Sequence, residues 1–154
     1  MDWIKALVTN PFLVAGLGSW FVAQVLKTII HAIINKKFTW ERLVGDGGMP
    51  SGHSATVTAV ATMALLVYGP GSFQFALAGI LAVVVCHDAM GVRLETGKQA
   101  MLLNEIVKAF EDVLKSGELP EVKLKEFVGH TPIQVITGIL IGIINAALLH
   151  YLVF

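Results

Sequence analysis

The chain has 154 residues, about the size of one domain, and its composition is strongly apolar. Hydrophobic residues make up 55%, and only 14% of the residues are charged, against about 25% in ordinary soluble domains. With a mean hydropathy of +0.74, this composition excludes a disordered chain and a coiled coil, and it leaves too little polar surface for a soluble globular domain. It is typical of a helical integral membrane protein.

Charge and cysteine content limit the partners. The chain has 11 basic and 11 acidic residues, so we expect no nucleic-acid partner, which would require a basic excess. The single cysteine, Cys86, lies in an apolar run and cannot form an intrachain disulfide. Asp2 offsets Lys5 in the first residues, which therefore lack the basic region of a signal peptide, and we expect the first apolar segment to be retained.

Four apolar segments follow one another along the chain. They comprise residues 11–34, 51–68, 73–86 and 131–154. The first and last have 24 residues each, about 36 Å as helices, which is enough to span a bilayer with some tilt. The third continues less purely to Val92 and is short, so its span is the least secure of the four. A Gly-Pro-Gly-Ser breaker at 69–72 joins it to the second as a tight helical hairpin. We therefore predict a single all-α domain over residues 1–154, a membrane-embedded bundle of about four transmembrane helices.

A polar stretch at 93–129 separates the third and fourth segments. Its apolar positions recur at helical spacing from Leu103 to Leu114, with charged residues between them, and Ser116-Gly117 follows. This pattern predicts one amphipathic cytoplasmic helix that ends near Gly117. We interpret it as a helix that rests on the bundle or on the membrane interface, with a lid over a site as the alternative.

Basic residues gather on one side of this topology. Nine of the 11 fall in the two long loops, 35–50 and 93–129, whereas Lys5 lies on the other side and Lys27 lies inside the first segment. The positive-inside rule therefore predicts that both loops are cytoplasmic and that both termini lie on the opposite face.

Side chains able to perform chemistry gather at segment ends that this topology brings to the cytoplasmic face. These residues are Ser51 and His53, then Asp88 and Arg93, then His130; Gly52 adds a backbone that can approach an anion closely. Two helix N-termini point there, and their unpaired N–H groups and positive dipole ends favour phosphate. Nearby cations supply charge; these are Arg93, Lys98 and Lys125. Two histidines are suited to the roles of nucleophile and general acid.

The motif Pro50-Ser51-Gly52-His53 resembles the PSGH motif of the type 2 phosphatidic acid phosphatase superfamily. Residues 130–138 are similar to its third motif, H-x-x-x-D-V-x-x-G. Nearly the whole chain resembles the small divergent branch of this superfamily, related to acid phosphatases and vanadium-dependent haloperoxidases, through the segments 47–55, 88–93, 97–104 and 129–132. The resemblance implies hydrolysis of a phosphomonoester without metal or cofactor. In this scheme His130 attacks phosphorus, His53 protonates the leaving oxygen, and Ser51, Gly52 and the cations hold the phosphate oxygens.

Two cations stand where the superfamily's pattern is broken. The first motif, K-x6-R-P, is absent, and Lys27 is the expected replacement, because a lysine inside a span is costly and seldom idle. Lys27 shares one helix face with Gln24 and His31. The arginine expected six to seven residues before the nucleophile is also missing, and Lys125 is its expected replacement as a point charge.

The aspartate that orients the nucleophile is replaced by Gln134. It lies one helical turn after His130, so we expect it to hold the ring, although an amide does not stabilise an imidazolium by charge. Asp88 or Glu126 is the expected compensation. A further pattern, Gly138-x-x-x-Gly142, is typical of close helix packing, within the bundle or across a dimer.

These residues support a leading hypothesis and two alternatives. The leading one is a membrane phosphatase acting on a lipid phosphate of the phosphatidic acid, phosphatidylglycerol phosphate or polyprenyl phosphate class, with a homodimer completing the wall of the site. The first alternative is a non-catalytic lipid-phosphate binder or scaffold that lost turnover through Gln134. The second is a metal site or small transporter built from His53, His87, Asp88 and His130. We rank it last and expect no metal, because no metal-ligand spacing such as H-x-x-x-H is present.

Overall fold

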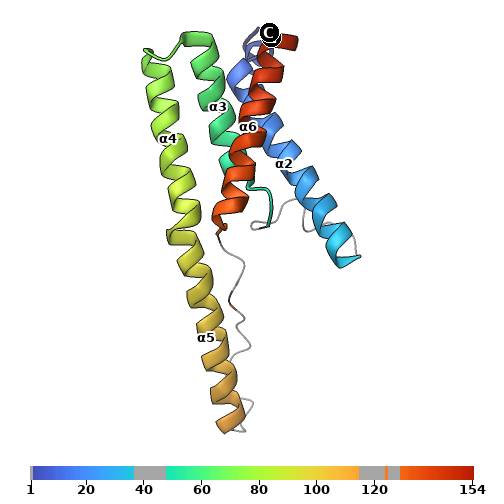
Figure 1. The fold of residues 1–154 in the computed structure, drawn as a ribbon, viewed down its shortest axis with the longest axis vertical. Helices are drawn as coiled ribbons and strands as arrows, with labels where there is room; N and C mark the ends of the chain where they lie inside the picture. The colour runs from blue at the N-terminus through green and yellow to red at the C-terminus, as the bar shows by residue number, and fades with distance from the viewer. Residues whose placement is uncertain (1, 37–47, 115–123, 125–128) are drawn as a thin grey trace.

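Six helices run through the part of the chain that the structure, a computed structural model, describes: residues 2–36, 48–114, 124 and 129–154. They are α1 (Asp2–Val8), α2 (Pro11–Asn35), α3 (Gly52–Tyr68), α4 (Phe73–Met90), α5 (Val92–Leu114) and α6 (Pro132–Leu152). The described residues form no strand, and α2, α3, α4 and α6 pack as a bundle (Figure 1). The predicted all-α membrane bundle is confirmed.

Capping side chains explain where the long helices begin. The Oδ1 atom of Asn10 accepts hydrogen bonds from the N–H groups of Phe12 and Leu13, two of the donors that the first turn of α2 leaves unpaired. In the same way the Oγ atom of Ser72 accepts from the N–H of Phe75 at the start of α4. The hairpin predicted between the second and third segments is confirmed, since α4 follows α3 after only four residues, 69–72.

Among the described residues, three helical stretches are long and apolar enough to cross a membrane: α2, the stretch Phe73–Phe110 that comprises α4 and most of α5, and α6. The shortest of the bundle helices is α3, with 17 residues, or about 26 Å against a hydrocarbon core of about 30 Å. The third segment, expected to be the least secure span because it is short, is α4, with 18 residues. The central helix is α3, which packs against α2, α4 and α6, so its neighbours shield it from lipid.

Small residues let α3 and α6 approach closely. A Cβ atom added to Gly142 would lie 2.5 Å from the backbone oxygen of Ala55, and one added to Gly138 would overlap the backbone oxygen of Ser51. Ala146, one turn further along α6, is fully buried in the core. The Gly-x-x-x-Gly pattern therefore packs within the bundle.

Enlarging Gly142 is expected to destabilise the bundle. Gly142→Leu would force α6 away from α3, and overpacking of this kind typically costs about 1–3 kcal/mol. The measurement is thermal unfolding of the purified protein in detergent. Gly79→Leu on α4 is the matched control, because an added Cβ there meets nothing within 4 Å. Equal unfolding temperatures for the two variants would contradict the close packing.

The amphipathic helix α5 does not lie where its sequence suggested. Only Gly91 separates the end of α4 from the start of α5 at Val92, and α5 continues the direction of α4 away from the bundle (Figure 1). Among the described residues α5 packs against α4 and no other helix. In the described residues it therefore does not rest on the bundle and does not cover the site, which corrects these two interpretations. That it lies on the membrane interface stays a prediction. Its predicted end near Gly117 lies outside the described residues.

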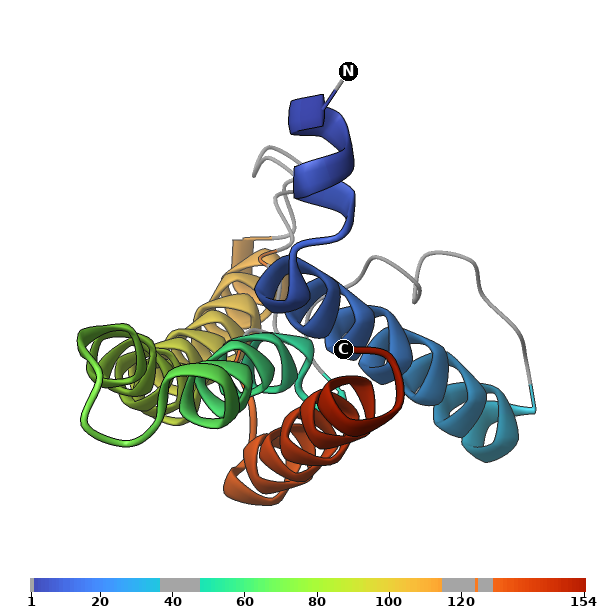
Figure 2. The same ribbon diagram turned by 90° about the horizontal axis from the view of Figure 1, so that it is seen from above.

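The short helix α1 was not predicted. It buries none of its residues, and it projects sideways from the bundle (Figure 2). The start of α2 and the end of α6 lie at the same end of the bundle as the α3–α4 hairpin, whereas α3 and α6 begin at the other end (Figure 1). Both chain ends are thus far from His53 and His130. That the end of the bundle where α3 and α6 begin faces the cytoplasm stays a prediction.

Candidate active site

Backbone hydrogen bonds bring the ends of three helices together at His130. The N–H of His130 donates to the carbonyl oxygen of Ala89 in the last turn of α4, at 2.9 Å. The N–H of Ser51, at the start of α3, donates to the carbonyl oxygen of Gln134 in the first turn of α6, also at 2.9 Å. The predicted convergence of these segment ends is therefore confirmed.

The side chain of Gln134 sets the tautomer of His130. Its Oε1 atom accepts the N–H of Thr131 at 3.1 Å and lies 3.2 Å from Nδ1 of His130. Because a backbone N–H only donates, the atom that faces it is the amide oxygen, and Nδ1 of His130 must then be the protonated nitrogen. Nε2 of His130 is left with its lone pair. The contact between Oε1 of Gln134 and Nδ1 of His130 is the geometry expected of a residue that orients the ring.

The surroundings of His130 favour a neutral imidazole. Its side chain is buried, with 4% of the residue exposed, and this burial lowers its pKa below the ordinary value of 6.5. The positive charge of Lys27 and the electrostatic effect of the neighbouring His53 lower this pKa further, while hydrogen bonds with Gln134 and the backbone of Gly48 oppose the shift. A neutral imidazole at pH 7 is the form in which Nε2 can attack phosphorus.

Lys27 reaches this site from α2, as predicted for the replacement of the missing first motif. Only 5% of the residue is exposed, and its charge acts on His130. Gly48 lies against its aliphatic stem: a Cβ there would be 3.5 Å from Cγ of Lys27. Gln24, on the same face, is also buried, and its Oε1 atom has no hydrogen-bond partner among the described residues. The structure therefore places Lys27 beside the candidate nucleophile.

Removing the charge of Lys27 is expected to raise the pKa of His130. A positive neighbour favours the neutral imidazole, so Lys27→Met should move the titration of His130 to higher pH. The measurement is an NMR titration of the histidine rings in detergent micelles. Lys5→Met, in the exposed helix α1 at the opposite end of the bundle, is the matched control. An unchanged titration in the Lys27 variant would show that its ammonium group is not near the ring.

His53 stands on the first turn of α3, and its side chain is exposed. It lines a pocket of about 330 Å³ together with Trp20 of α2 and Val85 of α4. The N–H groups of Gly52 and His53 belong to the first helical turn, where no intrahelical carbonyl is available to them. They and the positive end of the helix dipole form the part of the site suited to an anion.

Ser51 is engaged in structure rather than open to a ligand. It is fully buried, and its Oγ atom accepts the N–H of Ser54 at 3.3 Å and lies 2.9 Å from Oγ of Ser54. With its own N–H donated to Gln134, Ser51 caps α3 and ties it to α6. Its predicted contact with phosphate stays a prediction.

The order of these residues along the chain is that of a known family: residues 8–145 match the sequence pattern of the divergent PAP2 family. The chain belongs to the divergent PAP2 family. It is 40% identical over 153 residues to "Uncharacterized membrane protein YuiD" of Bacillus subtilis (strain 168), and the match covers 94% of this chain and 97% of that protein. No solved structure matches the chain. The resemblance found in the sequence is confirmed, and the chain is an integral membrane protein, as predicted.

Two further candidates from the sequence pair with each other. Nε of Arg93 donates to Oδ2 of Asp88, and both side chains are partly exposed. The carboxylate of Asp88 is thus directed at Arg93, while Gln134 holds the ring of His130. In this family member the orienting contact is therefore made by an amide, and roles for Asp88 in orientation and Arg93 in phosphate binding stay predictions.

Of the two other candidate lysines, the structure describes Lys98, which lies away from the cluster. Lys98 pairs with Glu95 on an exposed face of α5, about 9 Å of helical rise beyond Val92. Lys125, together with Glu126, lies outside the described residues. Within the described ranges, no group of three or more His, Cys, Asp or Glu side chains is placed to hold a metal ion.

Three backbone positions in the site were not singled out from the sequence. The carbonyl of Ala89 anchors His130, and the backbone of Gly48, at a φ of 83°, contacts its ring. Gly129 has a φ of 94°, and any Cβ there would overlap the backbone of Leu94. Glycine at both left-handed positions avoids a steric penalty. The available signal was a glycine directly before His130 and another five residues before His53.

Proposed function

We propose that this member of the divergent PAP2 family is a membrane lipid-phosphate phosphatase that works through a phosphohistidine on His130. The proposal rests on two hydrogen bonds that Oε1 of Gln134 accepts, one from the N–H of Thr131 and one from Nδ1 of His130. With the proton of the neutral ring on Nδ1, Nε2 of His130 is unprotonated. A neutral imidazole beside a buried lysine and a helix N-terminus has the nucleophile and the positive surroundings that attack on a phosphate group requires.

The proposed reaction has two steps. Nε2 of His130 attacks phosphorus, the bond from phosphorus to the ester oxygen breaks, and His53 gives a proton to the leaving oxygen. Water then attacks the phosphohistidine, the bond from phosphorus to nitrogen breaks, and His53 takes a proton from that water. Inorganic phosphate and the lipid alcohol are the products, and both histidines return to their starting states.

The proposed substrate is an amphiphile. The site lies at one end of a bundle whose helices expose large apolar side chains, so the tail of a lipid can remain beside the bundle while its phosphate reaches the helix ends. Phosphatidic acid, phosphatidylglycerol phosphate and polyprenyl phosphates or diphosphates have this form. By the positive-inside rule, the site faces the cytoplasm.

The test is phosphate release by the purified protein in detergent from a panel of these lipid phosphates, with EDTA present. We expect release to survive the chelator and to fall about 10²–10⁴-fold in His53→Ala, the loss typical when a general acid is removed. The same variant should lose much less of its rate with a substrate whose leaving group needs no proton, such as a nitrophenyl phosphate. Absence of release by folded protein from every substrate would contradict the proposal.

A second candidate function is binding of lipid phosphate without hydrolysis. Two observations favour it: Gln134 is neutral where the superfamily has a carboxylate, and Ser51 is buried with its hydroxyl engaged in capping. Such a protein would retain the anion site formed by Lys27 and the start of α3. Saturable binding of a lipid phosphate, with no release of phosphate, would support this function over the first.

A further inference from the structure

The large apolar side chains of the short helix α1 lie on one side of it. They are Trp3, Ile4, Leu7 and Val8, and all four are exposed. At 3.6 residues per turn they fall within an arc of about 140°. The charged side chains of Asp2 and Lys5 lie on the opposite side. The helix is therefore amphipathic, although none of its residues is buried in the protein.

Packing against the described part of the protein does not stabilise α1. The helix has 7 residues, and a helix shorter than about 12–15 residues is marginal in water without tertiary packing. Among the described residues α1 contacts α2 and no other helix, and it buries no residue there. A bilayer interface supplies the missing stabilisation, because it takes up apolar side chains and favours backbone groups that bond to one another within a helix.

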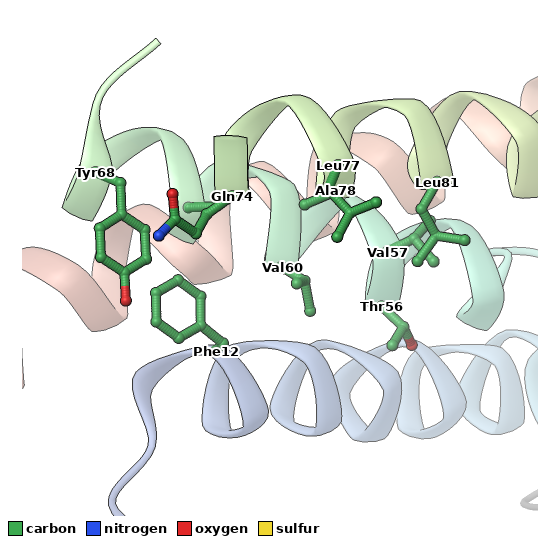
Figure 3. Close-up of a pocket in the computed structure, with 10 residues that line it drawn as sticks. Phe12, Thr56, Val57, Val60, Tyr68, Gln74, Leu77, Ala78 and Leu81 are labelled. Carbon is green, nitrogen blue, oxygen red and sulfur yellow. The ribbon is translucent and has the colours of Figure 1, made fainter. Parts of the chain in front are cut away.

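The start of α2, from which α1 departs, is fixed in the bundle on one side. The ring of Phe12 stacks on the ring of Tyr68 with centroids 5.4 Å apart, beside a pocket of about 480 Å³ between α2, α3 and α4 (Figure 3). Asn10 caps α2 two residues after the end of α1. These contacts fix the point at which the chain enters the first spanning helix.

The apolar side of α1 opens toward a different side of α2, the one that faces lipid. Leu7 and Val8 line a hollow of about 690 Å³ together with residues of α2 that include Leu13, Leu17 and Phe21. These three side chains are exposed on a helix that is long and apolar enough to span the membrane. Because α1 also lies across the direction of the bundle helices (Figure 2), it lies where the surface of the bilayer meets the start of α2.

We propose that α1 is a membrane-binding helix that lies in the plane of the lipid–water interface. Leu7 and Val8 contact the acyl chains that fill the hollow beside α2, and Asp2 and Lys5 lie among the headgroups. Trp3 suits this depth, because tryptophan is enriched where a membrane meets water. This surface lies at the end of the bundle away from the candidate active site, so the inference does not depend on the proposed function.

Spin labels on the two sides of α1 test its placement. In a Cys86→Ala background, labels would be attached to Leu7→Cys and, as the matched control, to Lys5→Cys, with the protein in phosphatidylcholine bilayers. The label at position 7 should collide more with oxygen, which concentrates in lipid, and less with a water-soluble nickel chelate than the label at position 5. Equal access of the chelate to both labels would mean that α1 lies off the bilayer. Equal access of oxygen to both would mean that it is inserted in the core, and exclusion of both reagents from position 7 would mean that protein covers this side; each result overturns the proposal.

A charge on the apolar side should release the helix from the interface. With the label at Val8→Cys, Ile4→Glu should move the label from contact with oxygen to contact with the nickel chelate, because a carboxylate is costly to hold against hydrocarbon. Lys5→Glu, on the side that faces headgroups, should leave the label where it is. An unmoved label in the Ile4 variant would overturn the proposal. Neither measurement uses turnover, so both are independent of phosphate release.

Discussion

Replacing His130 by alanine is expected to abolish phosphate release from every lipid phosphate that the wild-type protein hydrolyses. The variant lacks the nitrogen that would bond to phosphorus, and loss of a covalent nucleophile lowers kcat by about a thousandfold or more in well-studied hydrolases. Lys27 and the first turn of α3 remain, so binding of the lipid phosphate should persist. Loss of release with retained binding is the pattern that separates a nucleophile from a binding residue.

The measurement pairs steady-state phosphate release with trapping of the phosphoenzyme. Wild-type protein quenched during turnover should carry phosphate in an acid-labile, alkali-stable form, and His130→Ala should carry none. His150→Ala is the matched control, because His150 lies in the last turn of the same helix, at the end away from the site. Near-normal turnover by the His130 variant would place the nucleophile elsewhere, with His53 as the next candidate.

The helices of the bundle were predictable because their signals are local. Apolar runs of membrane length indicate spans, and the side chains of Asn10, Ser51 and Ser72 accept the first N–H groups of the helices that follow them. The meeting of His53 and His130 followed from topology alone, since consecutive spans alternate in direction. In the structure, the hydrogen bond from the N–H of Ser51 to the carbonyl of Gln134 connects these ends.

The direction of α5 was not predictable in the same way. Amphipathic spacing indicates a helix and identifies its apolar face, but it does not say whether the helix turns back or continues the one before it. That outcome depends on the backbone at Gly91, where one residue joins the two helices and its N–H still bonds to the carbonyl of His87. A single glycine is compatible with either course.

Within the site, side-chain chemistry was predictable and backbone contacts were not. Gln134 and Lys27 lie where the sequence placed them, because helical spacing determines which residues share a face. The carbonyl of Ala89 has no sequence signal, because every residue has a carbonyl group. The hydroxyl of Ser51 suits both a cap and an anion, and only its neighbour Ser54 shows that it serves as a cap.

Gln134 is expected to control both the rate and its pH dependence. In Gln134→Leu, Nδ1 of His130 and the N–H of Thr131 both lose their acceptor, and the imidazole is free to adopt the tautomer protonated at Nε2. We expect kcat to fall by about 10²–10⁴-fold, within the range seen when the partner that sets a catalytic tautomer is lost. Gln134→Glu keeps both bonds in a side chain of the same length and adds a charge that stabilises the imidazolium, so it should raise kcat.

The sign of the pH effect follows from the nucleophile's need to be neutral. Rate falls as pH drops through the pKa of His130, and since burial lowers that pKa, the acidic limb of kcat/KM should lie below pH 6.5 in the wild-type protein. A carboxylate at position 134 raises the pKa, so Gln134→Glu should move the limb to higher pH. Gln99→Glu, on an exposed face of α5, should leave it in place. A limb that does not respond in the Gln134 variant would mean that the titration belongs to another group, and that the ring of His130 is not the nucleophile.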